Sequence, residues 1–348
     1  MNAIRVGIIG LGANTRLRHV PGLQACDDVE IVSVCNRRPE STGKAADEFG
    51  IAKTFDKWQD LVADADIDAV VIGTWPYLHR DITVAALQAG KHVLVEARMA
   101  RNAAESHQML KASRQNDHLV AQIVPSPFGL RVHQTVRQLL ADGYVGELRE
   151  VVVLGCNAAN ANPAIPLHWR QSAELSGLNM LAMGILHETL IRWVPDPVRV
   201  LAQTQIFTAQ RPVAETGEPS DVGTPDSVHV LTELPGGARG IYHLSSVTHH
   251  APPLQIRIFG SEGTLQYLCG ADDQLLGARK DEGELTEIQI PVEKQGRWRV
   301  EADFIDAIRG NRSVEFTDFA TGVRYMEFTE AVAQSAARGQ AIGLPLEG

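Results

Sequence analysis

Two glycines near the N-terminus, Gly10 and Gly12, directly follow the apolar run Ile4–Ile9. An apolar strand that ends in such a turn can point backbone N–H groups at a pyrophosphate where a helix begins. Thr15 stands where the third glycine of a GxGxxG motif would be, so an ordinary strand-to-helix turn is the alternative. In the nucleotide interpretation, the residues that hold the pyrophosphate are Gly10, Gly12, Asn14 and Thr15.

The end of the next apolar run carries residues that could bind the adenosine half of a dinucleotide. Asn36 follows this run, with Arg37, Arg38 and Ser41 close behind. Sites that prefer NAD usually place an acidic residue here for the ribose 2′-hydroxyl, whereas arginine and small polar groups accommodate a 2′-phosphate. The sequence therefore favours NADP(H). NAD(H) stays open, because the arginines can instead solvate a loop while Asn36 bonds an unphosphorylated ribose.

The composition is that of a globular protein that acts on small molecules. The chain has 348 residues, of which 44% are hydrophobic and 21% are charged, and its formal net charge is −10. This acidity argues against a nucleic-acid or anionic-membrane partner, because both need basic surfaces. The four cysteines lack CxxC spacing, the N-terminus begins with the first strand, and no apolar run reaches about 18 residues. These features predict a cytoplasmic protein with reduced thiols.

Alternating apolar and amphipathic segments predict the elements that position these residues. Up to residue 123, helix-like segments separate the apolar runs VGIIG, VEIVSVCN, IDAVVIGT, KHVLVE and HLVAQIV. This alternation predicts an α/β fold with a doubly wound parallel sheet, helices covering both faces. Residues 1–123 are therefore predicted to form a dinucleotide-binding Rossmann domain. Its expected helices are Glu40–Phe49, Lys57–Ala63, Asp81–Ala89 and Ala103–Gln115.

The pattern changes after Val124, where PSPFG interrupts the alternation. Consecutive strand-like runs joined by short turns then predict a mainly antiparallel open sheet. Residues 124–348 are therefore expected to form an α+β domain that supplies substrate-binding groups. The polar stretch Thr208–Asp226 is expected to be a surface loop, or else a lid or subunit-contact arm. The expected strands are Leu148–Leu154, Val198–Ile206, Ser227–Leu234, Arg239–Val247, Gln255–Phe259 and Thr264–Leu268, and the expected helices are Val132–Asp142, Leu178–Val194, Arg299–Arg309 and Ala320–Arg338.

Several motifs, in this order and spacing, resemble the glucose–fructose oxidoreductase, inositol dehydrogenase and MocA family of NAD(P)-dependent enzymes. GTWPYLH at Gly73–His79 resembles that family's TPNxxH, and VEARMA at Val95–Ala100 stands where the family has EKPxA. The remaining similarities are Trp169–Arg170 before SGLNMLAMGILHE, RIFGSEGTL at Arg257–Leu265, and FIDAIRGN at Phe304–Asn311. The resemblance implies a Rossmann fold, a nicotinamide cofactor and a homo-oligomer assembled through the C-terminal sheet.

The motif match also assigns further site residues. In the resembling family, the glutamate that matches Glu96 lies near the nicotinamide ribose, and Thr74, Trp75 and His79 fall in the cofactor-adjacent motif. His79 could instead cap the helix that begins there. A polar and aromatic cluster suited to sugar hydroxyls and a ring face comprises His168, Trp169 and Arg170.

Two departures from the family pattern affect catalysis. Ala97 occupies the position of the usual catalytic lysine, and Arg98 replaces the proline that follows. Alanine cannot shuttle a proton, whereas the arginine stays protonated and could bind a hydroxyl-rich or anionic ligand or form a surface or interdomain salt bridge. The family's Asp and His pair is not preserved either, since the Asp is absent and His187 comes one residue late.

His187 is nevertheless the best candidate for proton transfer, because imidazole titrates near neutrality, and a structural histidine is the alternative. Its HExxI context excludes the HExxH zinc motif, and no metal site is expected. Glu96 is the second catalytic candidate, since it would position the nicotinamide side of the cofactor.

These residues support three functional hypotheses. The first is an NAD(P)-dependent oxidoreductase that transfers hydride to or from a sugar, polyol or related hydroxylated small molecule. Loss of the lysine motivates the second, a redox-assisted lyase, epimerase or glycosidase whose bound cofactor is reduced only transiently. The third is a non-catalytic NAD(P)-binding sensor or partner subunit. We favour the first, because Glu96, His187 and the Trp169–Arg170 pair keep a chemically competent lining.

Overall fold

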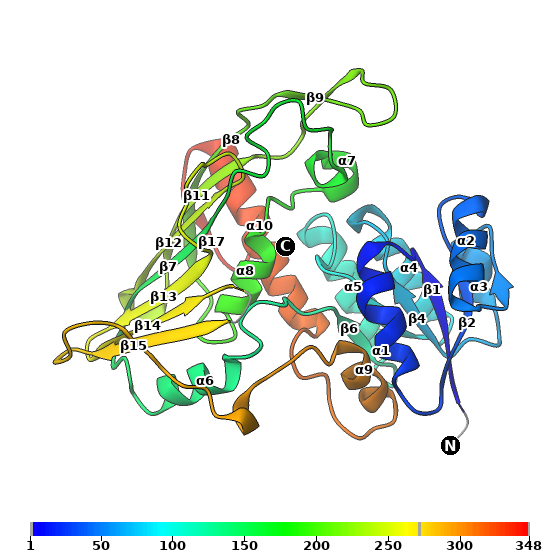
Figure 1. The fold of residues 1–348 in the computed structure, drawn as a ribbon, viewed down its shortest axis with the longest axis horizontal. Coiled ribbons are helices and arrows are strands. Elements are labelled where there is room, and N and C mark those ends of the chain that lie inside the picture. The colour runs from blue at the N-terminus through cyan, green and yellow to red at the C-terminus, as the bar shows by residue number, and fades with distance from the viewer. Residues whose placement is uncertain (1–2, 271–272, 347–348) are drawn as a thin grey trace. The chain divides into compact units, whose positions relative to one another are not determined.

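The computed structural model describes residues 3–270 and 273–346, which divide into two compact units. The first unit comprises the chain up to Pro125 together with Arg299–Met326, and the second comprises Ser126–Trp298 and the chain from Glu327 onward (Figure 1). The chain first passes from one unit to the other after Pro125, two residues after the expected domain boundary at residue 123. Residues 299–326, however, were expected in the second domain and belong to the first unit.

The return of the chain to the first unit has a physical basis in packing. Helix α9 (Val300–Ile308) packs against α1 (Val20–Gln24), and the Ile123 N–H donates to the Thr317 carbonyl at 2.9 Å. The side chains of Phe319, Val323, Tyr325 and Met326 then enter the core of this unit. Sequence order alone does not reveal such a return, because the apolar faces involved also suit a helix of the second unit.

The sheet of the first unit is parallel throughout, with the strand order β3-β2-β1-β4-β5-β6. Its central strands are apolar because helices cover both faces, and every residue of β4 is buried. The doubly wound fold expected from the sequence is confirmed. The strands are β1 Ile4–Ile9, β2 Val29–Cys35, β3 Lys53–Thr54, β4 Ala69–Ile72, β5 His92–Val95 and β6 Ala121–Ile123.

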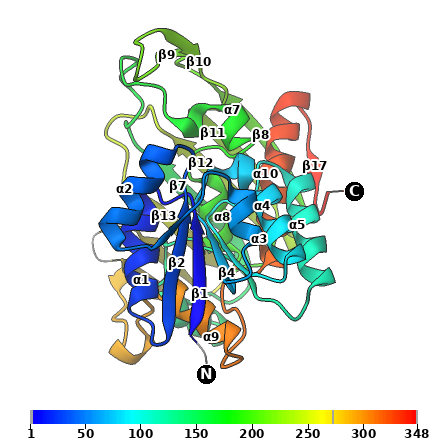
Figure 2. The same cartoon turned by 90° about the vertical axis from the view of Figure 1, so that its right-hand side faces the viewer.

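Helices flank this sheet in two groups. Figure 2 shows α1 and α2 apart from α3, α4 and α5, with strands β1, β2 and β4 between them. Helix α4 packs against both α3 and α5. The bounds are η1 Thr15–His19, which continues into α1, then α2 Pro39–Phe49, α3 Trp58–Ala63, α4 Pro76–Gln88 and α5 Ala103–Gln115.

The second unit is built on a nine-stranded sheet with the order β16-β15-β14-β13-β7-β12-β11-β8-β17. Neighbouring strands are antiparallel except for β7 and β12, which are parallel. The mainly antiparallel sheet is thus confirmed, and β15, β16 and β17 are additions to the expected strands. The strands are β7 Leu148–Cys156, β8 Arg199–Gln205, β11 Ser227–Glu233, β12 Arg239–Ser245, β13 Gln255–Gly260, β14 Gly263–Leu268, β15 Gln274–Arg279, β16 Thr286–Glu287 and β17 Ile342–Gly343.

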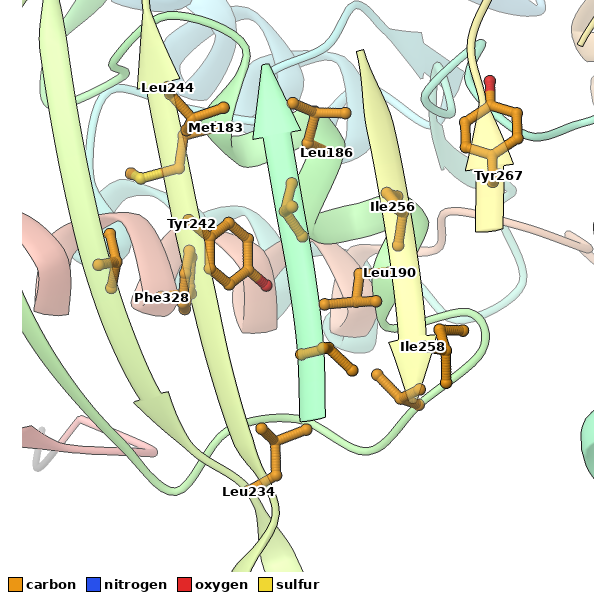
Figure 3. Packing of buried hydrophobic residues seen from close by; sticks show 14 of the residues in the cluster. Met183, Leu186, Leu190, Leu234, Tyr242, Leu244, Ile256, Ile258, Tyr267 and Phe328 are labelled. Atoms are coloured by element: carbon orange, nitrogen blue, oxygen red, sulfur yellow. The ribbon is translucent and has the colours of Figure 1, made fainter. Parts of the chain in front are cut away.

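Helices α6 (His133–Ala141) and α8 (Met183–Leu190), with the later turns of α10 (Phe319–Arg338), cover one face of this sheet. Figure 3 shows Leu186 and Leu190 of α8 and Phe328 of α10 packed against Tyr242 and other strand residues. Helix α8 is shorter than the expected Leu178–Val194 because Leu181 adopts a left-handed conformation with φ of 47°. The short helices of this unit are α7 Ala173–Ser176, η2 Trp169–Gln171, η3 Pro235–Gly237 and η4 Val292–Lys294.

The polar stretch Thr208–Asp226 contains a small hairpin instead of an irregular loop. Strands β9 (Gln210–Pro212) and β10 (Pro219–Asp221) pair antiparallel within it. The buried Arg211 guanidinium donates to the backbone carbonyls of Asn160, Asn162 and Ile165, which fastens the hairpin to the preceding segment. Across both described ranges, no helix is long and apolar enough to span a membrane.

Candidate functional site

The glycine turn after β1 depends on the absence of side chains. Gly10 has a φ of 86°, and a Cβ there would lie 2.7 Å from backbone atoms of Gly73 and Thr74. Gly12 instead faces open space, since a Cβ there would have its nearest contact at 4.0 Å, with Gly73. The first glycine therefore lets two loops approach each other, and the second leaves room for a ligand.

Thr15 takes the place of the third glycine by packing into the turn. Its side chain is buried, and its hydroxyl donates to the Gly10 carbonyl at 3.2 Å. Neither Thr15 nor Asn14 lines the pocket in front of the turn. The side chains of these two predicted pyrophosphate residues are instead bonded within the protein, Thr15 to Gly10 and Asn14 to Glu96.

A pocket of about 480 Å³ opens in front of the turn at the carboxyl edge of the sheet, where α/β proteins bind their ligands. Thr74 is one of its lining residues, and the buried hydroxyl of Thr74 has no hydrogen-bond partner in the described part of the chain. An open glycine cradle and an orphaned polar atom fit a dinucleotide. Of the predicted residues, the pocket is lined by Gly10, Gly12, Asn36, Arg37, Thr74 and Trp75, and it adds Asp56, Lys57, Trp58 and Tyr77.

The sequence could have revealed the additional residues. Asp56, Lys57 and Trp58 follow the two-residue strand β3, which is too short to give a hydrophobic signal. Once β3 is placed beside β2, the residues after it must lie at the same carboxyl edge as Asn36.

Asn36 holds the pocket together through its side chain. Its Oδ1 accepts from the Leu11 N–H at 2.7 Å, and its Nδ2 donates to the Ser41 carbonyl at 3.0 Å. Asn36 therefore ties the glycine turn to the start of α2. Arg37 is exposed and lines the pocket, whereas Arg38 is exposed but lies outside that lining, and its carbonyl accepts from the Ser41 hydroxyl.

His79 lies behind the pocket wall rather than on it. The side chain is fully buried, its Nε2 is 2.9 Å from the Thr74 carbonyl, and its Nδ1 is 2.9 Å from the Arg98 carbonyl. Burial lowers the pKa of His79. Because the ring contacts carbonyls instead of the N–H groups at the start of α4, it joins two loops and does not cap the helix.

A cluster of two carboxylates and one imidazole lies beside the turn. Glu96 follows β5, and its Oε1 accepts from Asn14 Nδ2 and lies 3.0 Å from His19 Nε2. On the other side of the ring, His19 Nδ1 lies 2.5 Å from Oε1 of Glu301 in α9. The motif search missed His19 and Glu301. The signal was a histidine in the first helix after the turn, but its partner Glu301 is 282 positions away.

The charges in this cluster reinforce one another. Burial alone would lower the pKa of His19, but hydrogen bonds to Glu301 and Glu96 raise it to about 9. Burial alone would also raise the pKa of Glu96, but His19 and Asn14 lower it. At neutral pH the cluster therefore holds an imidazolium and an ionised Glu96 carboxylate.

Ala97 and Arg98 come directly after Glu96. The peptide bond between them is cis, and the Ala97 N–H donates to Glu96 Oε2 at 3.1 Å. The Arg98 side chain is 5% exposed, which excludes the surface salt bridge considered from the sequence.

His187 belongs to the core of the second unit. The side chain is fully buried, and its ring stacks on Phe328 with centroids 3.6 Å apart and an angle of 9° between the planes. Its Nδ1 lies 2.7 Å from the hydroxyl of Tyr242, whose pKa burial raises well above 10. Sequence reasoning identified the histidine and missed both aromatic partners, which come from β12 and α10.

The cluster at His168, Trp169 and Arg170 is present as a compact group around η2. The Arg170 guanidinium lies 4.3 Å from the Trp169 ring centroid, and the rings of His168 and Trp169 are 5.5 Å apart. Burial and the Arg170 charge lower the pKa of His168. The structure thus groups the predicted cofactor residues in the first unit and the polar aromatic cluster in the second.

Comparison with known sequences adds the family to this geometry. A model described as an oxidoreductase family with an NAD-binding Rossmann fold matches residues 4–123, and the C-terminal domain of the same family matches residues 133–266. The chain belongs to the Gfo/Idh/MocA family of oxidoreductases. The family resemblance inferred from the motifs is thereby confirmed.

Individual relatives match over nearly the whole chain. A 1,5-anhydro-D-fructose reductase of Ensifer adhaerens is 27% identical over 97% of both chains. A scyllo-inositol 2-dehydrogenase (NADP(+)) of Bacillus subtilis is 24% identical over 100% of this chain and 90% of its own. Among solved structures, levoglucosan dehydrogenase in complex with NADH and L-sorbose superposes with a TM-score of 0.88, at 23% identity over 98% and 99% of the chains. At that identity the structural likeness establishes the fold.

Proposed function

We propose that this protein is an NAD(P)-dependent oxidoreductase that acts on a CH–OH group of a sugar, polyol or related hydroxylated molecule. The observation that carries the proposal is the glycine-lined pocket at the carboxyl edge of the sheet in the first unit, whose lining residue Thr74 has a buried hydroxyl without a partner among the described residues. The names of the relatives, which reduce or oxidise sugars and inositols, support this substrate class. The first unit would bind the dinucleotide, and the second would supply substrate groups.

When bound, the nicotinamide supplies the hydride chemistry, and the chain orients it. The turn at Gly10 and Gly12 would hold the pyrophosphate, because the missing side chain of Gly12 leaves the backbone open to a ligand. The pocket lining also contains two cations, Arg37 and Lys57, and one carboxylate, Asp56. This excess of positive charge, with Asn36 in place of an acidic residue, favours the 2′-phosphate of NADP(H) over NAD(H).

Fluorescence titration with NADPH and NADH tests the cofactor assignment. We expect NADPH to bind more tightly, and we expect Arg37→Ala to weaken NADPH roughly 10- to 100-fold while NADH changes little, since a charge-assisted phosphate contact is lost. Lys44→Ala is the control, because it removes an exposed cation of α2. Equal affinities for both nucleotides would contradict the NADP(H) preference, and no binding of either would overturn the proposed function.

The reaction also needs a group that transfers a proton to or from the substrate, and Ala97 offers no acid or base. We assign this proton transfer to His187, which has Tyr242 as its hydrogen-bond partner. The hydroxylated substrate would contact the Trp169–Arg170 group of the second unit. His187→Gln should lower kcat by about 10²- to 10⁴-fold, the usual contribution of a general acid or base. Full activity of this variant in a screen of sugars and polyols would contradict the role of His187.

The same screen tests the type of reaction. Product formed without net formation or consumption of NAD(P)H would contradict simple oxidoreduction.

We also propose that the protein forms a homo-oligomer through the uncovered face of the nine-stranded sheet. Leu201, Leu231 and Ile241 lie side by side across β8, β11 and β12, and they are 43%, 55% and 47% exposed. A row of exposed apolar side chains on this face suits a second copy of the same sheet.

A further inference from the structure

His19 contacts a carboxylate with each ring nitrogen. Nδ1 faces Glu301 at 2.5 Å and Nε2 faces Glu96 at 3.0 Å, and the side chain is fully buried. A neutral imidazole has a single N–H and can donate to one of them, whereas an imidazolium donates to both. The geometry therefore calls for a charged ring, in accord with the pKa of His19 being raised to about 9 by these hydrogen bonds against burial.

Gly22 makes this arrangement sterically possible. It lies in α1, one turn after His19, and a Cβ at this position would lie 2.6 Å from Glu301 Oε2. The missing side chain lets the Glu301 carboxylate reach across α1 to the ring. Other titratable groups near the cluster include Cys26, whose pKa is raised by burial and by Glu301, and His79, whose charge would act on Glu96.

The strand order places Glu96 on the far side of the turn from the adenosine residues. Asn36 follows β2, Gly10 follows β1, Gly73 follows β4 and Glu96 follows β5, and these strands are neighbours in that order. A dinucleotide with its adenosine half beside Asn36 and its pyrophosphate at Gly10 therefore extends its nicotinamide half toward Glu96.

The two oxygens of Glu96 are used differently. Oε1 accepts from both Asn14 and His19, whereas Oε2 accepts one described hydrogen bond, from the Ala97 N–H. A carboxylate oxygen can accept more than one donor, and the side chain is 14% exposed. Oε2 is thus the atom with capacity left for a ligand.

We propose that His19 is a positioning residue that keeps Glu96 ionised and turned so that Oε2 accepts a hydrogen bond from the nicotinamide half of the bound dinucleotide. The inference rests on the proposed function. Without the imidazolium, Glu96 would lie buried beside the carboxyl group of Glu301 with no positive charge between them, which favours the protonated form of Glu96. A protonated Glu96 would donate a hydrogen bond where it should accept one, and its carboxyl group would lose the hydrogen bond from His19 that fixes its orientation.

Ligand affinity separates this role from a general effect on folding. In His19→Gln we expect NADPH and NADH to bind roughly 10- to 100-fold more weakly, as for a lost hydrogen bond to a charged group. Adenosine 2′,5′-bisphosphate and ADP, which have no nicotinamide half, should bind this variant as they bind the unchanged protein. His118→Gln, at an exposed histidine of the same unit, is the control. The proposal would be overturned if the variant bound the complete dinucleotides and the two adenosine ligands with equally weakened affinity.

The pH profile supplies a second readout, which also serves if His19→Gln does not fold. In Glu301→Gln one of the two carboxylates that hold the imidazolium is neutral, so the alkaline loss of NADPH affinity should begin at lower pH than in the unchanged protein. The affinity for adenosine 2′,5′-bisphosphate should not show this change in its pH dependence. Identical alkaline limits for NADPH in both proteins would overturn the proposal.

Nuclear magnetic resonance of His19 in the ligand-free protein distinguishes failure of this inference from failure of the proposed function. We expect the ring to titrate near pH 9 and to shift downward in Glu301→Gln. A ring that titrates at or below its ordinary value of about 6.5 would overturn the positioning role even if NADPH binds. Failure of the unchanged protein to bind either nucleotide would instead reject the proposed function.

Discussion

At the level of single residues, histidines of this chain acquire different chemistry from their surroundings. Two carboxylates stabilise the protonated form of His19, His79 is buried between carbonyls, and His187 stacks on Phe328 beside Tyr242. Burial lowers the pKa of His79, whereas in His19 hydrogen bonds reverse that effect. The partners of a histidine, more than its place in a motif, thus decide whether it carries charge.

His19 makes the stability of the protein depend on alkaline pH. Its pKa of about 9 in the folded chain exceeds the unfolded value of 6.5, so the stabilisation is complete below pH 6.5 and is lost as the pH rises through 9. We expect the free energy of unfolding to fall by about 3 kcal/mol over this range. Urea unfolding between pH 6 and 10 measures it. In His19→Gln the decline should be absent, and an equal decline in both proteins would contradict the assignment.

At the level of elements, the first helix after the glycine turn is shaped by what lies on its other side. Gly22 leaves space for the Glu301 carboxylate, so α1 can approach α9 closely. The buried guanidinium of Arg211 likewise joins residues 157–171 to the hairpin of β9 and β10, together with a hydrogen bond from the Leu167 N–H to the Pro212 carbonyl. In both places one residue contributes to how two separate segments fit together.

Gly22→Ala should therefore destabilise the protein, although alanine usually stabilises a helix relative to glycine. The new methyl group displaces Glu301 from His19, and we expect a loss of roughly 1–3 kcal/mol in the free energy of unfolding. Gly43→Ala is the matched control, because a Cβ at this α2 position meets nothing within 4 Å. It should stabilise the protein by roughly 0.5–1 kcal/mol through better helix propensity. Urea titration that finds both variants equally stable would refute this account.

Arg211→Met should loosen the hairpin without unfolding the second unit. The carbonyls of Asn160, Asn162 and Ile165 lose their shared donor, and opening of this region should become roughly tenfold or more frequent. Limited thermolysin digestion with mass spectrometry should show faster cleavage within residues 157–171 and 206–226. Arg199→Met, which removes an exposed arginine from β8, should leave the cleavage rate unchanged. Unchanged cleavage in Arg211→Met would show that the hairpin is held by other contacts.

At the level of the whole molecule, two units with different architectures divide the chemistry. The first offers an edge of parallel strands with an open pocket, and the second offers a broad sheet with helices on one face. The exposed row Leu201, Leu231 and Ile241 lies on the face that these helices leave uncovered. An assembly of copies through this face is the form in which these side chains would be shielded from water.

Leu231→Lys should dissociate that assembly, because a charged side chain would be buried at the centre of the row. We expect the dissociation constant to rise at least about tenfold, as for the loss of one well-buried leucine. Sedimentation velocity over a range of concentrations measures the change. Val292→Lys is the control, since Val292 is 83% exposed in η4, outside the sheet. A molecular mass unaffected by Leu231→Lys would argue against this face as the interface.

Much of the fold was predictable because local patterns specify it. Buried parallel strands read as apolar runs, so β1, β2, β4, β5 and β6 were all anticipated, and helix α5 was predicted with its observed bounds. Short elements gave too little pattern, as with β3 and β17. The start of α8 was also misjudged, since the left-handed Leu181 leaves no mark in the hydrophobic periodicity.

The sequence by itself determined the doubly wound first sheet, the glycine turn and the antiparallel character of the second sheet, because each depends on neighbouring residues. The tertiary structure alone decided that Arg299–Met326 returns to the first unit and that Glu301 meets His19. It also decided that His187 is stacked in a core. Such contacts join residues far apart in the chain, and their energy comes from burial and charge pairing that no local pattern encodes.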